Sequence, residues 1–174
     1  MQHLNFEVKA RTNRHAAIRA WLLANGAESH GTDWQTDTYF HLPPGAGRLK
    51  LRQGNIENNL IHYHRANDAQ ARMSDVALSP VTDATSLKNI LERALGILVE
   101  VHKRREIYFI QNVKFHLDEL EGLGHFVEIE AIATSSALSF QHLQAQCAHY
   151  MTAFEIESRD ILAESYSDML MQRL

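Results

Sequence analysis

Several segments of this chain alternate charged and apolar residues, and within a segment the charges often share one sign. In HFVEIEAI the two glutamates, Glu128 and Glu130, lie two residues apart between aliphatic neighbours. Side chains two apart in a β-strand point to the same face, so both carboxylates should lie together. RLKLRQ repeats the pattern with cations, because Arg48, Lys50 and Arg52 alternate with leucines. These segments predict strands of a sheet with one apolar face and one charged face.

The same alternation recurs along the chain. The N-terminal LNFEVKAR places Asn5, Glu7, Lys9 and Arg11 on one face and apolar residues on the other. The further predicted strands are WQTDTYFHL, LIHYHRA, LVEVHKRREIYFI and NVKFHLDEL, of which the last two are joined by a QN turn.

Helices are predicted between and after the strands. TNRHAAIRAWLLANG is typical of a helix with Thr12 or Asn13 as its N-cap and Gly26 just past its end. A polar loop should follow LIHYHRA and lead to a helix over TSLKNILERALG. SALSFQHLQAQCAHYMTAF and ILAESYSDMLMQRL complete the predicted helices. This order predicts an α+β fold with a mostly antiparallel sheet, rather than a doubly wound parallel sheet.

Composition sets limits on the class of protein. The 174 residues, 45% of them hydrophobic, suit a single domain over 1–174. A net charge of −4 does not indicate a basic surface for nucleic acid. The single cysteine, Cys147, excludes an internal disulfide and a cysteine zinc cluster, and its helical context suits a small buried side chain. Without a signal-peptide core or a long apolar run, we expect a cytoplasmic protein without a membrane span.

The charged faces allow two interpretations. They could be the solvent-exposed side of a sheet whose other side packs on helices, which is common in antiparallel sheets. They could instead line the inside of a closed sheet, which the runs of one sign favour. In such a lumen the cations would hold phosphate oxygens, and the carboxylates would hold a hard divalent cation such as Mg²⁺ or Mn²⁺.

Seven segments, in order, resemble the CYTH superfamily of triphosphate tunnel metalloenzymes. They are NFEVKAR, QTDTYF, GRLKLRQ, HYHRA, VHKRREIY, HLDELEGLGHFVEIE and SYSDML. The family includes class IV adenylate cyclases, thiamine triphosphatases and inorganic tripolyphosphatases, and the cyclase-like branch is the most similar. The resemblance implies an antiparallel tunnel barrel of about eight strands with helices on the outside. It also implies Mg²⁺ or Mn²⁺ as cofactor and ATP, thiamine triphosphate or tripolyphosphate as the small-molecule partner, in a monomer or homodimer.

The resemblance assigns roles to residues by their position. The implied metal ligands are Glu7, Asp118, Glu128 and Glu130. The implied triphosphate contacts are Lys9, Lys50, Arg52, Arg65, Lys103 and Arg105. Glu7 and Lys9 are the implied catalytic residues, although we expect Lys9 to bind phosphate rather than to transfer protons. Further candidates on the same predicted faces are Arg11, Arg48, Lys114 and His116.

One position departs from the family pattern. The N-terminal signature Glu-x-Glu-x-Lys is replaced here by Asn5-Phe6-Glu7-Val8-Lys9. An asparagine still offers an amide oxygen, but one negative charge is lost. Weaker metal binding, the loss of one metal site, or a protein that binds a triphosphate without turning it over are therefore alternatives.

We expect a metal-dependent triphosphate phosphohydrolase, with a class IV adenylate cyclase as the first alternative and a non-catalytic binding module as the second. The same ring of charges serves hydrolysis and cyclisation, because only the nucleophile and the position of the substrate differ. A cupin-like metal site at His62 and His64 is disfavoured, because HYHRANDAQ offers only Asp68 where cupins carry a glutamate.

Overall fold

The computed structural model describes residues 5–64, 75–134 and 138–173, which form one eight-stranded sheet and four α-helices. The strands are β1 (Asn5–Arg11), β2 (Glu28–Phe40), β3 (Arg48–Gln53), β4 (Asn59–His64), β5 (Asp75–Pro80), β6 (Ile97–Ile110), β7 (Val113–Leu120) and β8 (Gly124–Ile132). Their order is β1-β8-β7-β6-β2-β3-β4-β5, and every neighbouring pair is antiparallel. The predicted α+β antiparallel fold is therefore confirmed.

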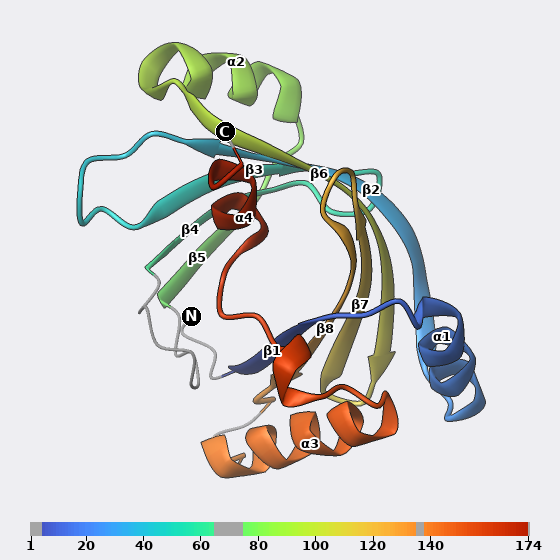
Figure 1. The fold of residues 1–174 in the computed structure, drawn as a ribbon. Helices are drawn as coiled ribbons and strands as arrows, with labels where there is room; N and C mark the ends of the chain where they lie inside the picture. Colours follow the sequence, from blue (N-terminus) through green and yellow to red (C-terminus); the bar gives the residue numbers. More distant parts are fainter. Residues whose placement is uncertain (1–4, 65–74, 135–137, 174) are drawn as a thin grey trace.

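The sheet curves into a half-barrel with β1 and β5 as its edges in the described part of the chain (Figure 1). Helices α1 (His15–Ala24) and α3 (Phe140–Ala153) lie on its convex side, and α2 (Ala84–Leu95) lies over β2 and β3. The short helix α4 (Tyr166–Met171) lies on the concave side. The helices outside the barrel match the predicted arrangement, whereas α4 contributes to its interior.

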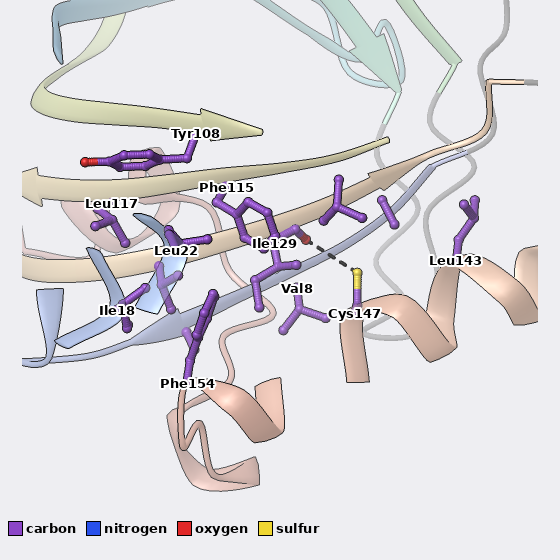
Figure 2. Packing of buried hydrophobic residues seen from close by; sticks show 14 residues of the cluster. Val8, Ile18, Leu22, Tyr108, Phe115, Leu117, Ile129, Leu143, Cys147 and Phe154 are labelled. Atoms are coloured by element: carbon purple, nitrogen blue, oxygen red, sulfur yellow. Dashed lines mark hydrogen bonds between the residues drawn. The ribbon is translucent and has the colours of Figure 1, made fainter. Parts of the chain in front are cut away.

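The convex face is an apolar core built from alternate residues of β1, β7 and β8. Phe115 and Ile129 are fully buried there, against Leu22 of α1 and Leu143 and Cys147 of α3 (Figure 2). Burying a side chain of this size contributes about 1.5–3 kcal/mol. The Cys147 thiol donates to the Ile129 carbonyl at 3.8 Å, and burial raises its pKa to about 12. The expected burial of the cysteine is confirmed.

A second apolar cluster closes one end of the concave side. It joins Tyr39 of β2 and Phe126 of β8 to Tyr166 and Met169 of α4. Helix α4 is held there by a capping box, in which Ser165 accepts from the Asp168 amide at 3.2 Å and Asp168 accepts from the Ser165 amide at 3.1 Å. The packed cluster forms a floor beneath the interior of the half-barrel.

Strand register explains how the charges reach the concave face. Glu7 is paired with Glu130 and Lys9 with Glu128 across β1 and β8. Since neighbours along a strand face opposite sides, their aliphatic neighbours point to the convex core. The two-faced sheet inferred from alternation is the one observed.

Four sequence-based expectations about individual elements are corrected. Strand β5, Asp75–Pro80, lies where a polar loop was predicted, and β2 begins at Glu28, ahead of the predicted strand. The C-terminal segment is helical only over Tyr166–Met171, after a 3₁₀ turn at Ser158–Asp160. Helix α1 has Arg14 at its N-cap position without a side-chain cap, so neither predicted capping residue takes that role.

Within the described ranges, no helix has both the length and the apolar character needed to span a membrane.

Candidate functional site

A cavity of about 310 Å³ opens on the concave face of the half-barrel. All eight strands and the segment at the start of α4 contribute to its wall. The predicted site residues on this wall are Glu7, Lys9, Lys50, Arg52, Lys103, Arg105, Glu128 and Glu130, together with Lys114 and His116. Residues more than a hundred positions apart in the sequence therefore share one concave surface.

A buried carboxylate, Asp37 of β2, organises the cations of one side of the cavity. Its oxygens accept from Lys50 at 2.9 Å, from Lys103 at 2.7 Å, and from the Arg52 guanidinium at 2.9 and 3.0 Å. We call these four residues the Asp37 cluster. Burial alone raises the pKa of Asp37, but the surrounding cations, Arg52 foremost, hold it well below its usual range.

Lys103 is the most deeply buried ammonium of the Asp37 cluster. Burial lowers the pKa of Lys103 to about 7, because the stabilising charge of Asp37 does not offset desolvation and the repulsion of Arg52 and Arg105. The charge of the Asp37 cluster therefore changes near neutral pH.

A second carboxylate, Glu57, stands on the loop between β3 and β4. Its oxygens accept from the Arg52 guanidinium at 2.9 Å and from the Lys114 ammonium at 3.0 Å. Burial raises the pKa of Glu57, but Lys114 and Arg52 outweigh it and lower the pKa to about 2. Glu57 is thus an anion at neutral pH that joins β3 to β7 across the cavity.

The opposite side of the cavity is acidic. Asn5, Glu7, Glu128 and Glu130 form what we call the acidic wall, and Glu7 lies directly across from Glu130 in the β1–β8 register. The Asn5 amide donates to Glu130 at 2.7 Å, and the Lys9 ammonium lies 3.6 Å from Glu128 and 3.8 Å from Glu7. Lys9 also lies over the Tyr166 ring, 4.4 Å from its centroid. Like charges directly opposite one another are unfavourable in a sheet.

The two glutamates of HFVEIEAI differ in their electrostatic surroundings. Burial raises the pKa of Glu130, and the charge of Glu128 adds to this against the hydrogen bond from Asn5. For Glu128 the charges of Lys9 and Arg105 outweigh burial, and its pKa lies well below the usual range. Of these two glutamates, Glu130 is therefore the one whose ionised form a further positive charge would stabilise more.

Asp118 lies beneath the wall rather than on it. It is fully buried, and its oxygens accept from the Arg105 guanidinium at 2.6 and 2.5 Å and from the Tyr166 hydroxyl at 2.7 Å. This bidentate pair fixes the orientation of Arg105, which also lies 3.3 Å from Glu128. The structure places Asp118 as a partner of Arg105 and off the cavity wall that Glu7, Glu128 and Glu130 line, although Arg105 contacts both Asp118 and Glu128.

Two further sequence candidates, Arg11 and Arg48, lie outside the cavity wall. Arg11 donates to the Leu123 carbonyl at 2.9 Å, and Arg48 donates to Ser165 at 2.9 Å and Asp168 at 2.6 Å. Both therefore hold segments next to the floor of the cavity. The predicted triphosphate contact Arg65 falls outside the described residues.

Comparison with known proteins identifies the family. The family model described as the CYTH domain matches residues 3–160. The chain belongs to the CYTH family. A search of curated protein sequences gave no match for this CYTH domain.

Solved structures similar to this CYTH domain include proteins with different described activities. PH1012 from Pyrococcus horikoshii has a TM-score of 0.81 and 23% identity, over 95% of this chain and 98% of that one. A proposed adenylate cyclase from Vibrio parahaemolyticus has a TM-score of 0.79 and 19% identity, over 98% and 99%. A proposed adenylyl cyclase from Hippeastrum, described as having a dominant triphosphatase activity, has a TM-score of 0.67 and 14% identity, over 98% and 95%. At these identities the likeness establishes the shared fold.

The acidic wall of this CYTH domain has the donor chemistry of a site for a hard divalent cation. Carboxylate and amide oxygens are the ligands that Mg²⁺ and Mn²⁺ prefer, and Glu7 faces Glu130 within this wall. In the part of the chain that the structure describes, no three His, Cys, Asp or Glu groups are already gathered at metal-binding spacing. A cation bound here would therefore draw these carboxylates together and relieve the repulsion between them.

His116 lies beside the acidic wall and is neutral at physiological pH. Burial, followed by the charge of Arg105, lowers its pKa to about 4 although Glu128 opposes this. Its Nδ1 lies 3.4 Å from Glu128, and its Nε2 has no hydrogen-bond partner among the described residues. His116 thus supplies an imidazole rather than another charge to the cavity.

Two central residues, Asp37 and Glu57, were absent from the sequence-based assignment. Asp37 lies in QTDTYF, a segment that supported the family resemblance, but a lone acid among threonines and tyrosine gives no run of like charge. Glu57 lies in the GNIENN loop, where no strand periodicity predicts the direction of a side chain. The available signal for Asp37 was its place in a predicted strand, on the same face as Gln35 and Tyr39.

Proposed function

We propose that this CYTH domain is a divalent-metal-dependent phosphohydrolase acting on a triphosphate in the concave cavity. The observation that carries the proposal is the gathering of cations and carboxylates from separate strands around one cavity. Cations of this kind bind phosphate oxygens, while the carboxylates suit a metal that bridges protein and phosphate.

The balance of charge in the cavity supports metal dependence. In the described part of the chain, six cations line the wall: Lys9, Lys50, Arg52, Lys103, Arg105 and Lys114. Six carboxylates lie on the wall or directly beneath it: Glu7, Asp37, Glu57, Asp118, Glu128 and Glu130. A multiply charged triphosphate therefore gains little net attraction from these residues alone, and a divalent cation supplies the missing positive charge.

In this proposal the two sides of the cavity have different tasks. Lys50 and Arg105 bind and orient the phosphates, and Asp118 holds the Arg105 guanidinium in place for this contact. Glu7, Glu128 and Glu130 would hold the metal, and a divalent cation bound there would supply Lewis-acid polarisation of the phosphoryl oxygens. In the proposed hydrolysis, the oxygen of a water bonds to the terminal phosphorus as the bond from this phosphorus to the bridging oxygen breaks, so that orthophosphate forms and the remaining phosphate chain leaves. Glu7 takes the proton of this water, and Lys9 stabilises charge on the phosphate oxygens.

Adenylate cyclase activity is the second candidate. The resemblance to the Vibrio protein supports it, as does the apolar part of the cavity wall formed by Ile61, Val76 and Leu78 of β4 and β5. Such a surface can bury an organic ring attached to the triphosphate. In this reaction the ribose 3′-hydroxyl, rather than water, attacks the α-phosphorus, and pyrophosphate leaves.

A binding module without turnover is the third candidate, and Asn5 supports it. Asn5 uses its amide NH₂ to hold Glu130, where a second carboxylate would have added negative charge for a metal. Fewer charged ligands weaken the hold on a divalent cation.

The predicted cytoplasmic location, the monomeric or dimeric state and the absence of a nucleic-acid partner remain predictions.

The test is to incubate the protein with ATP, thiamine triphosphate and tripolyphosphate, each with Mg²⁺, Mn²⁺ or a chelator, and to resolve all products. We expect orthophosphate, formed only when metal is present. Cyclic AMP with pyrophosphate would establish the cyclase instead. Binding of a triphosphate without any product, in every metal condition, would establish the binding module.

A further inference from the structure

The loop between β3 and β4 directs a carboxylate into the cavity between two cations that come from distant strands. Arg52 lies on β3 and Lys114 on β7, and β6 and β2 separate these strands in the sheet. The curvature of the sheet brings both cations to Glu57, at 2.9 and 3.0 Å. An anion therefore already occupies the position between Arg52 and Lys114.

The backbone of this loop is fixed by a fully buried residue. Asp33 accepts from the amide of Ile56 at 2.9 Å and from the amide of Glu57 at 3.0 Å. Gly54 allows this close approach, because a Cβ there would lie 2.6 Å from an Asp33 oxygen. The backbone of the loop therefore holds Glu57 at the cavity.

The hydrogen bonds of Arg52 and Lys114 show what a ligand has to replace. Arg52 uses Nε and Nη2 for Asp37 and Nη1 for Glu57. Lys114 donates to Glu57 as well. A phosphate that takes the position between Arg52 Nη1 and the Lys114 ammonium has to displace the Glu57 carboxylate that both now bind.

We propose that Glu57 is an internal competitor of the substrate, occupying a phosphate position between Arg52 and Lys114 until a substrate phosphate displaces its carboxylate. This rests on the proposed function, since it takes a triphosphate as the ligand of the same cavity. The Glu57 carboxylate weakens the binding of anions to Arg52 and Lys114, because an anion has to displace a carboxylate that belongs to the same chain. Anions of low charge, such as orthophosphate, are then held weakly, which favours product release.

The test compares the wild type with Glu57→Gln, which keeps the shape of the side chain and removes its charge. Calorimetric titration with tripolyphosphate in chelator should give about tenfold tighter binding for Glu57→Gln, because one carboxylate no longer competes or repels. Glu119→Gln is the matched control, since Glu119 lies 4.0 Å from Arg104 with about half of its side chain exposed. It should bind like the wild type.

A second background tests the position of the competition. In Lys114→Met, the gain from Glu57→Gln should shrink to about threefold or less, since one of the two shared cations is gone. Thermal unfolding of each variant shows whether the fold is kept, and Glu57→Ala replaces Glu57→Gln if it is not.

The outcomes separate the two proposals. If the wild type binds tripolyphosphate as tightly as both Glu57 variants, the competitor role is overturned. The proposed function is left standing by that result. Absence of tripolyphosphate binding in the wild type and both Glu57 variants, with and without Mg²⁺, would overturn the proposed function and the competitor role with it.

Discussion

The Asp37 cluster and the acidic wall face each other across one cavity and differ in how neighbouring groups compensate their like charges. In the Asp37 cluster three cations share a single carboxylate at 2.7–3.0 Å. In the acidic wall, Glu7 lies opposite Glu130, and the Glu130 carboxylate accepts a hydrogen bond from the uncharged amide of Asn5. On the cationic side opposite charges are in direct contact, whereas burial and the charge of Glu128 both disfavour the ionised form of Glu130.

This difference separates stability from function. Groups that already compensate each other in the free protein contribute to folding, and removing one leaves buried charge behind. Groups that repel each other cost stability and are kept ready for a ligand that relieves the repulsion. Mutation of Asp37 should therefore act mainly on the fold, and mutations of the glutamates in the acidic wall mainly on metal-dependent activity.

The largest expected effect is that of Asp37→Ala. It leaves three cations without their shared carboxylate in a buried place, and the free energy of unfolding should fall by about 3–5 kcal/mol. Urea unfolding measures this, with Asp83→Ala, which removes the side-chain cap of α2 at the surface, as a control that should lose much less stability. A loss no larger than that of the control would mean that the cations are compensated in another way.

The same residue gives a dependence on pH. The folded-state pKa of Asp37 lies well below its unfolded value, so its contribution is complete above about pH 4 and is lost as the pH falls through the folded pKa. Asp37→Ala should therefore lose less stability than the wild type on acidification.

Glu130→Gln should have the largest effect on activity, with little loss of fold. Removing this metal ligand should lower metal-dependent turnover by about 100-fold. Mn²⁺ should raise the melting temperature of the wild type and not of Glu130→Gln, because a ligand stabilises only the protein that binds it. Full turnover in the variant would show that the metal is held by other residues.

Stability should also respond to Glu130→Gln in a direction set by pH. The folded-state pKa of Glu130 is raised, so the folded protein binds this proton more tightly than the unfolded chain does. Wild-type stability should therefore fall as the pH rises from the ordinary glutamate pKa through the folded one, and the variant should lack this fall. Denaturant unfolding in chelator from pH 4 to pH 8 measures it.

Lys103→Met tests the Asp37 cluster by a smaller effect. Lys103 titrates with a pKa of about 7 in the folded protein, so the wild type should bind tripolyphosphate up to about tenfold more weakly at pH 8 than at pH 6. The variant should lose this step. Between about pH 7 and pH 10 only the unfolded chain keeps the Lys103 proton, so the stability of the wild type should rise with pH over this range. Lys103→Met should lack this rise. Identical pH profiles for both proteins would contradict the assignment.

The smallest expected effect is that of Asn5→Asp, which gives the acidic wall a further carboxylate. An added carboxylate next to Glu130 should lower stability in chelator by about 1 kcal/mol or less and tighten Mn²⁺ binding. Thermal unfolding with and without Mn²⁺ should show a larger metal-induced shift than in the wild type. An equal shift would mean that Asn5 does not limit metal affinity.

Alternation predicted most of the sheet because a strand with one buried face records that face in every second residue. Strand β5 was missed, since DVALSP is short and carries no run of charge on either face. The C-terminal segment was predicted to be helical over its whole length, but only Tyr166–Met171 forms a helix against the floor of the cavity. Tertiary packing, which a local pattern does not contain, set the limits of both segments.

The same limit applies to the site. Alternation could assign Glu128 and Glu130 to one face, but it could not distinguish a carboxylate that faces the cavity from one committed to an arginine. Asp118 follows the alternation of its strand, but its carboxylate oxygens accept hydrogen bonds from Arg105 and Tyr166. Partner choice depends on which strands meet across the barrel, and this follows from the sheet order rather than from any single segment.

The pairing of β1 with β8 also has a consequence for how the chain folds. Asn5 is paired with Ile132, so the first strand finds its partner only after more than a hundred residues have been placed. Contacts so distant in the sequence are slow to form, because the entropy of closing the long intervening loop has to be overcome first. On the ribosome, β1 has no partner in this register until β8 emerges. Glu7 and Glu130 therefore meet late, and the acidic wall is completed only after the other strands of the sheet have formed.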